Sequence, residues 1–198
     1  MDRERLTAFT DGVLAVIITI MVLELKPPAG AEFRNLLALW PGYLSYVLSF
    51  VYVAIYWNNH HHFFQLVRTV DGSILWANMH LLFWLSIVPF TTSWMGGNLF
   101  AAAPTALYGV ALLLSAVAWN IMQSTIIRRQ GPDSPLRAAI GRDLKGKASP
   151  VMYLAGIGMA WVSPAVSYLL YLAVALMWLI PDRRVETAVK QAAALGPE

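Results

Sequence analysis

The sequence has 198 residues, of which 58% are hydrophobic and 13% are charged, and it carries eight Trp and a formal net charge of +3. A soluble domain has about 45–50% apolar and about 25% charged residues, so this composition excludes an ordinary soluble protein and predicts an integral membrane protein. Because the chain has no Cys, it can form no disulfide, thiolate metal site or cysteine nucleophile.

The first predicted span covers residues 6–26. Its apolar run, residues 13–23, contains Thr19 as the one polar residue and lies between Asp11 and Glu24, and a Pro pair then ends the helix. No small-residue cleavage site follows, so the run is a span and not a signal peptide. The run alone crosses only about half of a ~30 Å hydrocarbon core, so polar neighbours must approach the membrane. Because these are costly against lipid, we expect the helix to face the middle of an assembly.

One face of this helix carries a nearly apolar stripe at helical spacing. Its members are Gly12, Val16, Thr19, Ile20 and Leu23. Such a stripe is typical of ordinary helix–helix packing, and it also fits the wall of a pore in which Thr19 is the polar ring. The periodicity leaves both interpretations open.

The second and third predicted spans cover residues 36–57 and 73–94. The second is long enough to cross with some tilt, has aromatic residues near its ends, and runs into a polar end with three consecutive His residues, followed by a loop to Gly72. The third contains Pro89 and several polar residues. Backbone groups freed by a membrane proline need partners on neighbouring helices, so we expect this span to be kinked and interior.

The fourth predicted span, residues 101–127, is rich in small residues that allow close helix contacts. A polar, basic segment follows it. Within that segment we expect a short amphipathic helix over residues 135–144, lying on the membrane surface.

The last apolar region is too long for one span and slightly short for two. Because it is interrupted near its middle, we expect two short helices over residues 147–162 and 164–180. Ser163 is the expected N-cap and Pro164 the first residue of the last helix.

The distribution of basic residues predicts the topology. Of the 14 Lys and Arg residues, all but Lys26 and Arg34 fall on the N-terminal side if the chain crosses six times. Five crossings would move Arg183, Arg184 and Lys190 across and divide the basic residues nine against five. The positive-inside rule therefore favours six spans, with both termini cytoplasmic and the protein multi-pass in the cell membrane. We expect residues 1–198 to form one all-α transmembrane domain with no nucleic-acid partner.

The ionisable residues suggest two other functions. A proton-coupled cation transporter could use Asp11 and Glu24, but the sequence lacks matching halves with broken helices. A membrane-embedded enzyme would need a base–nucleophile or metal constellation, and the His cluster supplies neither, so no catalytic residue, metal or cofactor is predicted. We expect Asp11 to point into the subunit, where Arg5 or His60 could neutralise it in a buried network.

A motif in the first helix resembles the signature of a known channel family. Arg5-x-x-x-Phe9-Thr10-Asp11-Gly12 is similar to the Arg-x-x-x-Phe-Ser-Asp signature of the transmembrane protein 175 family, the lysosomal potassium channels and their prokaryotic relatives. Trp57-x-x-His60-His61 and the segment from Asn78 to Thr91 resemble that family's second and third helices. The resemblance covers the first half of the chain in detail and the second half in architecture.

The resemblance implies a homotetramer of six-span subunits whose first helices line a central potassium pore without a carbonyl-lined filter. The chain also lacks a Thr-Val-Gly-Tyr-Gly loop. By position, the family's narrowest apolar ring falls on Val16, its polar Thr layer on Thr19, and its further apolar pore positions on Ile20 and Leu23. Potassium is then the permeating species, conducted passively, and membrane lipids are further partners.

Two positions depart from the family pattern. Thr10 stands where Ser is usual, which keeps the hydroxyl group and adds a methyl group. Val16 stands where Ile or Leu is usual, so a fourfold ring of these smaller side chains leaves a wider constriction. Closure is expected to come from dewetting of the rings of Val16, Ile20 and Leu23.

Overall fold

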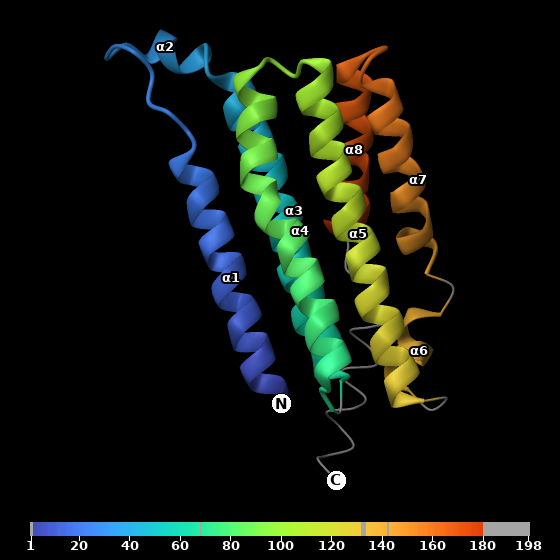
Figure 1. Cartoon of the computed structure of the whole chain (residues 1–198). Helices are drawn as coiled ribbons and strands as arrows, with labels where there is room; N and C mark the ends of the chain where they lie inside the picture. Colours follow the sequence, from blue (N-terminus) through green and yellow to red (C-terminus); the bar gives the residue numbers. More distant parts are fainter. Residues whose placement is uncertain (1, 68, 132–133, 142, 180–198) are drawn as a thin grey trace.

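The computed structural model describes residues 2–67, 69–131, 134–141 and 143–179, which form a bundle of helices (Figure 1). This part of the chain contains no β-strand, which confirms the all-helical prediction. Residues 180–198, which belong to the predicted single domain, lie outside the described residues. The helices are α1 (Arg3–Leu23), α2 (Phe33–Leu37), α3 (Trp40–Gln65), α4 (Gly72–Gly97), α5 (Ala102–Gln130), α6 (Pro135–Ile140), α7 (Leu144–Met159) and α8 (Pro164–Leu179).

The long helices run antiparallel to their neighbours along the chain (Figure 1). Helix α1 lies at one edge and packs mainly against α3 and α4, while α5 lies between α4 and the pair formed by α7 and α8. By length and composition, α1, α4 and α5 are able to cross a membrane. The helical content and apolarity therefore agree with a membrane protein.

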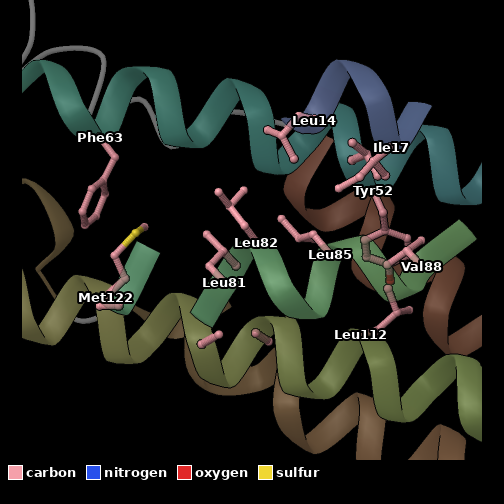
Figure 2. Packing of buried hydrophobic residues seen from close by; sticks show 14 of the residues in the cluster. Leu14, Ile17, Tyr52, Phe63, Leu81, Leu82, Leu85, Val88, Leu112 and Met122 are labelled. Carbon is pink, nitrogen blue, oxygen red and sulfur yellow. The ribbon is translucent and has the colours of Figure 1, made fainter. Parts of the chain in front are cut away.

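The hydrophobic core lies along α4. Figure 2 shows Leu81 and Leu85 of α4 in one cluster with Leu112 and Met122 of α5, and all four side chains are buried. Ile17 of α1 is also buried in this core. Helix α1 is therefore attached to the bundle by one apolar face.

Helix α1 begins and ends three residues earlier than its predicted span. Asp2 is the N-cap, and its carboxylate accepts a hydrogen bond from the Glu4 amide at 3.3 Å. A side-chain acceptor at this position satisfies a backbone donor that the helix cannot pair, so the helix starts at Arg3. The helix ends at Leu23, before the Pro pair at Pro27 and Pro28.

The predicted bounds of the second span, residues 36–57, are wrong for the helix that the structure contains. Helix α3 begins at Trp40 because Pro41, which lacks an N–H and fixes its own φ, fits the first turn of a helix. It continues to Gln65, so the three His residues lie within its last two turns and not in a polar end beyond it. A short separate helix, α2, precedes it.

Helix α4 is capped by Asp71, whose carboxylate accepts hydrogen bonds from the amides of Ser73 at 2.9 Å and Ile74 at 3.0 Å. The helix passes through Pro89 without interruption, and its polar residues Thr91 and Thr92 are buried. This burial agrees with the expected interior position of the helix.

The last two helices lie on either side of a turn, and α8 begins at Pro164, as the sequence predicted. The Ser163 carbonyl accepts the first helical hydrogen bond of α8 from Ser167, at 3.3 Å. Helix α7 starts and ends three residues before its predicted bounds. The short helix α6 stops at Ile140, earlier than predicted, because Gly141 adopts a positive φ of 56°.

Candidate functional site

The predicted stripe on α1 lies on the outside of the subunit. Val16 is 54% exposed, Ile20 42% and Leu23 79%, and Gly12 and Thr19 are exposed as well. The buried residues of α1 follow a second line at helical spacing: Leu6, Thr10, Leu14, Ile17 and Met21. One face of α1 therefore packs on α3 and α4, and the other presents the stripe to whatever lies beside the subunit.

The hydroxyl of Thr19 is oriented by its own helix. It donates a hydrogen bond to the carbonyl of Val16 at 2.9 Å. Because the hydroxyl proton is used in this bond, the oxygen lone pairs remain available as acceptors on the exposed face. An acceptor of this kind between apolar side chains is suited to a partly dehydrated cation.

A buried polar network joins α1 to α3 and α4. The Asn78 amide nitrogen donates to the Thr10 hydroxyl at 2.9 Å, and the Asn78 amide oxygen lies 3.0 Å from Nε2 of His60. Thr10 is 1% exposed, and His60 and Asn78 are each 2% exposed. The network brings together the two predicted motif residues Thr10 and His60 through Asn78, a residue that the sequence analysis did not place in the site.

The expectation for Asp11 is wrong in direction and in partner. Asp11 is exposed, and its carboxylate accepts a 3.0 Å hydrogen bond from the indole nitrogen of Trp57, not from Arg5 or His60. Successive residues of a helix differ by 100°, so the inward position of Thr10 turns Asp11 toward the flank of α3. The residue that could have indicated this partner is Trp57, an indole N–H donor one turn before His61 on α3.

The remaining motif residues face outward. Phe9 is 51% exposed, and Arg5 is exposed and makes no hydrogen bond or ion pair with the described residues. Of the motif residues, Thr10 and His60 therefore face inward, and Arg5, Phe9 and Asp11 face outward.

Polar contacts also attach both ends of α1. The Arg3 guanidinium donates to the carbonyls of Gln65 and Val67, each at 3.4 Å, at the C-terminal end of α3. At the other end, Glu24 is exposed and accepts a hydrogen bond from the Ser93 hydroxyl at 3.0 Å. Together with the Thr10 and Asp11 contacts, these bonds fix the rotation of α1 about its axis.

Two of the other histidines, His61 and His80, bond within their own helices, whereas Nδ1 of His62 is buried and has no hydrogen-bond partner among the described residues. His61 lies 2.9 Å from the Gln65 amide nitrogen, and His80 accepts from the Trp84 indole at 2.9 Å. Within the described residues, no group of three or more His, Asp or Glu side chains is placed to hold a metal ion.

Comparison with known proteins points to one family. The family described as endosomal/lysosomal potassium channel TMEM175 matches residues 5–89. A protein of Chryseobacterium sp. (strain P1-3) named as a potassium channel is 51% identical over 191 residues, covering 96% of this chain and all of the relative. A human relative, named as the endosomal/lysosomal proton channel TMEM175, is 26% identical over 130 residues, which cover 63% of this chain and 25% of that protein.

A solved structure is similar over nearly the whole bundle. The crystal structure of a lysosomal potassium-selective channel TMEM175 homologue from Chamaesiphon minutus matches with a TM-score of 0.78 and 27% sequence identity. The match covers 91% of this chain and 97% of that one. The similarity therefore extends beyond the motif to α5, α7 and α8.

Proposed function

Because the chain belongs to the TMEM175 family of endosomal/lysosomal potassium channels, we propose that it is a potassium channel whose pore is lined by α1. The observation that carries this proposal is the exposure of Val16, Ile20 and Leu23 along one face of a helix at the edge of the bundle. The bacterial relative that is named as a potassium channel matches over its full length, which supports the same function for the whole chain.

The pore requires several copies of the chain, because a single α1 encloses no channel. We propose a homotetramer in which the exposed stripes of four α1 helices face a common axis. The resemblance to the channel family supports the number four, and the edge position of α1 leaves its stripe accessible for such an assembly.

Conduction in this arrangement is passive and needs no cofactor. Rings of Val16, Ile20 and Leu23 would force a potassium ion to lose part of its hydration shell, and the outward lone pairs of Thr19 would offset part of that cost. Dewetting of the apolar rings would close the pore. No carbonyl-lined filter is required for this mechanism.

We propose six membrane spans, formed by α1, α3, α4, α5, α7 and α8, with both termini cytoplasmic in the cell membrane. At the end of the bundle that holds the N-terminus, the described residues include seven Lys or Arg: Arg3, Arg5, Arg128, Arg129, Arg137, Lys145 and Lys147. At the opposite end they include only Lys26 and Arg34. This asymmetry follows the positive-inside rule.

A proton-coupled transporter would use Asp11 and Glu24. The rise of a helix separates these residues by roughly 20 Å, and each accepts a hydrogen bond from a different helix. Each of them attaches α1 to a different neighbouring helix, and they do not form one coupling site. This separation favours the channel over the transporter.

Matched valine substitutions test the pore assignment. Val16 and Val22 are about equally exposed, at 54% and 46%, but a separation of six positions along the helix turns Val22 about 120° away from Val16. In liposome flux measurements, Val16→Asn and Leu23→Asn should increase potassium leak and weaken the discrimination against sodium, while Val22→Asn should have little effect. Unchanged flux in both Val16→Asn and Leu23→Asn would contradict the assignment.

A further inference from the structure

A groove lies beside α1 at the end of the bundle away from the N-terminus. It has a volume of about 700 Å³ and is bounded by the C-terminal end of α1, the first turns of α3 and the C-terminal half of α4. In Figure 1 these segments lie in the upper part of the bundle, on the side of α2. The volume is in the range of pockets that hold drug-sized or larger ligands.

Small residues create the floor of the groove. A Cβ atom added at Gly96 would lie 2.8 Å from the Cα atom of Gly42, so the backbones of α3 and α4 approach closely here. Gly97, the last residue of α4, lines the groove, and a Cβ atom there would have nothing within 4 Å. Gly42 and Gly96 therefore let the two helices pack closely at the floor, and Gly97 leaves open space beside them.

The lining changes from apolar to polar along the groove. Its inner part contains Ile20, Met21, Pro89 and Phe90, with Ser86 as a polar neighbour whose hydroxyl donates to the Phe83 carbonyl, and Ile20 and Phe90 are 42% and 61% exposed. Its outer part, near the helix ends, contains Lys26. The groove is mainly apolar inside and polar at its mouth, and it runs along membrane-crossing helices. This arrangement matches the apolar chains and the polar headgroup of a membrane lipid.

Two charged side chains, Lys26 and Glu24, line the mouth of the groove. Lys26 makes no hydrogen bond or ion pair with the described residues, whereas Arg34 at the same end is paired with Glu32. The Glu24 carboxylate accepts its hydrogen bond from the Ser93 hydroxyl of α4 and forms no ion pair with Lys26. The Lys26 ammonium group is therefore available to a phosphate.

We propose that this groove binds a phospholipid, with the phosphate on Lys26 and one acyl chain along Ile20, Pro89 and Phe90. The site does not depend on ion conduction. Where α1 lines the pore, as proposed above, the acyl chain would support the pore helix from outside, because Ile20 contributes to both surfaces.

Lipid titration followed by native mass spectrometry tests the site. The purified, delipidated protein in dodecyl maltoside is titrated with dioleoylphosphatidylglycerol, and in parallel with dioleoylglycerol, which has the same chains without the phosphate. The Gly97→Leu variant places a bulky side chain in the groove, and Gly158→Leu is its control, because Gly158 also lies near a helix end with nothing within 4 Å of an added Cβ. Thermal unfolding checks that each variant is folded.

The proposal predicts a saturable phosphatidylglycerol adduct that dioleoylglycerol does not form. Gly97→Leu should abolish it and Gly158→Leu should leave it unchanged. Loss of one charge-assisted hydrogen bond in Lys26→Gln should weaken binding by about tenfold. Adducts that persist in both Gly97→Leu and Lys26→Gln would overturn the proposal. A Gly97→Leu variant that alters the oligomer mass while keeping its lipid would also overturn it, because the groove would then hold a second copy of the chain.

Discussion

Asn78 of α4 donates a 2.9 Å hydrogen bond to the hydroxyl of Thr10 of α1, at a point where both side chains are buried. Because the Asn78 nitrogen is used in this bond, its oxygen faces His60 and must accept from Nε2. The proton of His60 is therefore assigned to Nε2. This chain of bonds fixes the inner face of α1 and so determines which residues remain on its outer face.

The first prediction concerns Thr10. Thr10→Val keeps the shape but leaves the Asn78 donor unsatisfied, and we expect a loss of about 1–3 kcal/mol in the free energy of unfolding. Thr10→Ser keeps the hydroxyl and should cost less than Thr10→Val. Denaturant unfolding in detergent measures the difference, and equal losses in the two variants would contradict the assigned role of the hydroxyl.

Substitutions at Asp11 distinguish a residue that attaches α1 to the bundle from a residue that couples transport to protons. Its carboxylate is bonded to the Trp57 indole, so Asp11→Asn, which keeps an acceptor oxygen, should retain potassium flux in the absence of a proton gradient. Trp57→Phe removes the donor and should weaken the attachment of α1 by about 1.5–3 kcal/mol at most, since the acceptor is charged and the site is exposed. Complete loss of flux in Asp11→Asn with normal folding would favour the transporter.

Gly109 lies where α5 meets α7 and α8. A Cβ atom at this position would overlap the Tyr171 hydroxyl and lie 2.9 Å from Cγ1 of Ile157. Tyr171 is fully buried and donates to the Thr105 carbonyl at 3.3 Å, so it has little room to move. We expect Gly109→Ala to destabilise the protein by about 1–3 kcal/mol through overpacking.

Gly158→Ala is the matched control for Gly109. It adds the same methyl group to helix α7 where nothing lies within 4 Å. Alanine has the higher helix propensity, so we expect a gain of up to about 1 kcal/mol. Similar unfolding temperatures for the two variants would show that α5, α7 and α8 do not pack as described.

The Asp71 carboxylate makes the stability of the folded protein depend on pH. The Ser73 hydroxyl, followed by the Ile74 amide and the charge of Arg129, lowers the pKa of Asp71 below its usual value. A lowered folded-state pKa means that the contribution of Asp71 is complete above its unfolded-state pKa of about 3.9 and is lost as the pH falls through the folded-state pKa. The contribution therefore stabilises the protein at neutral pH.

Asp71→Asn keeps a capping oxygen but cannot titrate or pair with Arg129. The parent protein should unfold at a higher temperature than this variant at pH 6, and the difference should shrink toward pH 3. Thermal unfolding across this range is the measurement. A difference that stays constant would mean that the carboxylate makes no charge-dependent contribution.

The sequence predicted the outer face of α1 because helical periodicity is a local property. Val16, Ile20 and Leu23 share a face in any α-helix, whatever packs around it. The partner of Asp11 could not be predicted in this way, because it depends on how α1 is rotated against α3, and Trp57 is 46 positions away along the chain. Polar residues within an apolar segment showed that α4 needed partners, but not that Asn78 would bridge α1 and α3.

The C-terminal bound of α3 could not be predicted from hydropathy. A hydropathy pattern ends where polar residues begin, so it stopped before the three His residues. The helix continues through them because buried His60 stacks on Phe64, with ring centroids 4.3 Å apart, and bonds to Asn78. These tertiary contacts offset the polarity of the segment.

The most direct measurement of the central claim is potassium flux in liposomes that contain the purified protein and are loaded with high potassium, without valinomycin and without an imposed proton gradient. A parallel sample replaces potassium with sodium. We predict rapid flux that dissipates the gradient, favours potassium over sodium and needs no counter-transported proton. Flux that appears only with an imposed proton gradient, or only with obligatory exchange, would contradict the channel and assign coupling roles to Asp11 and Glu24.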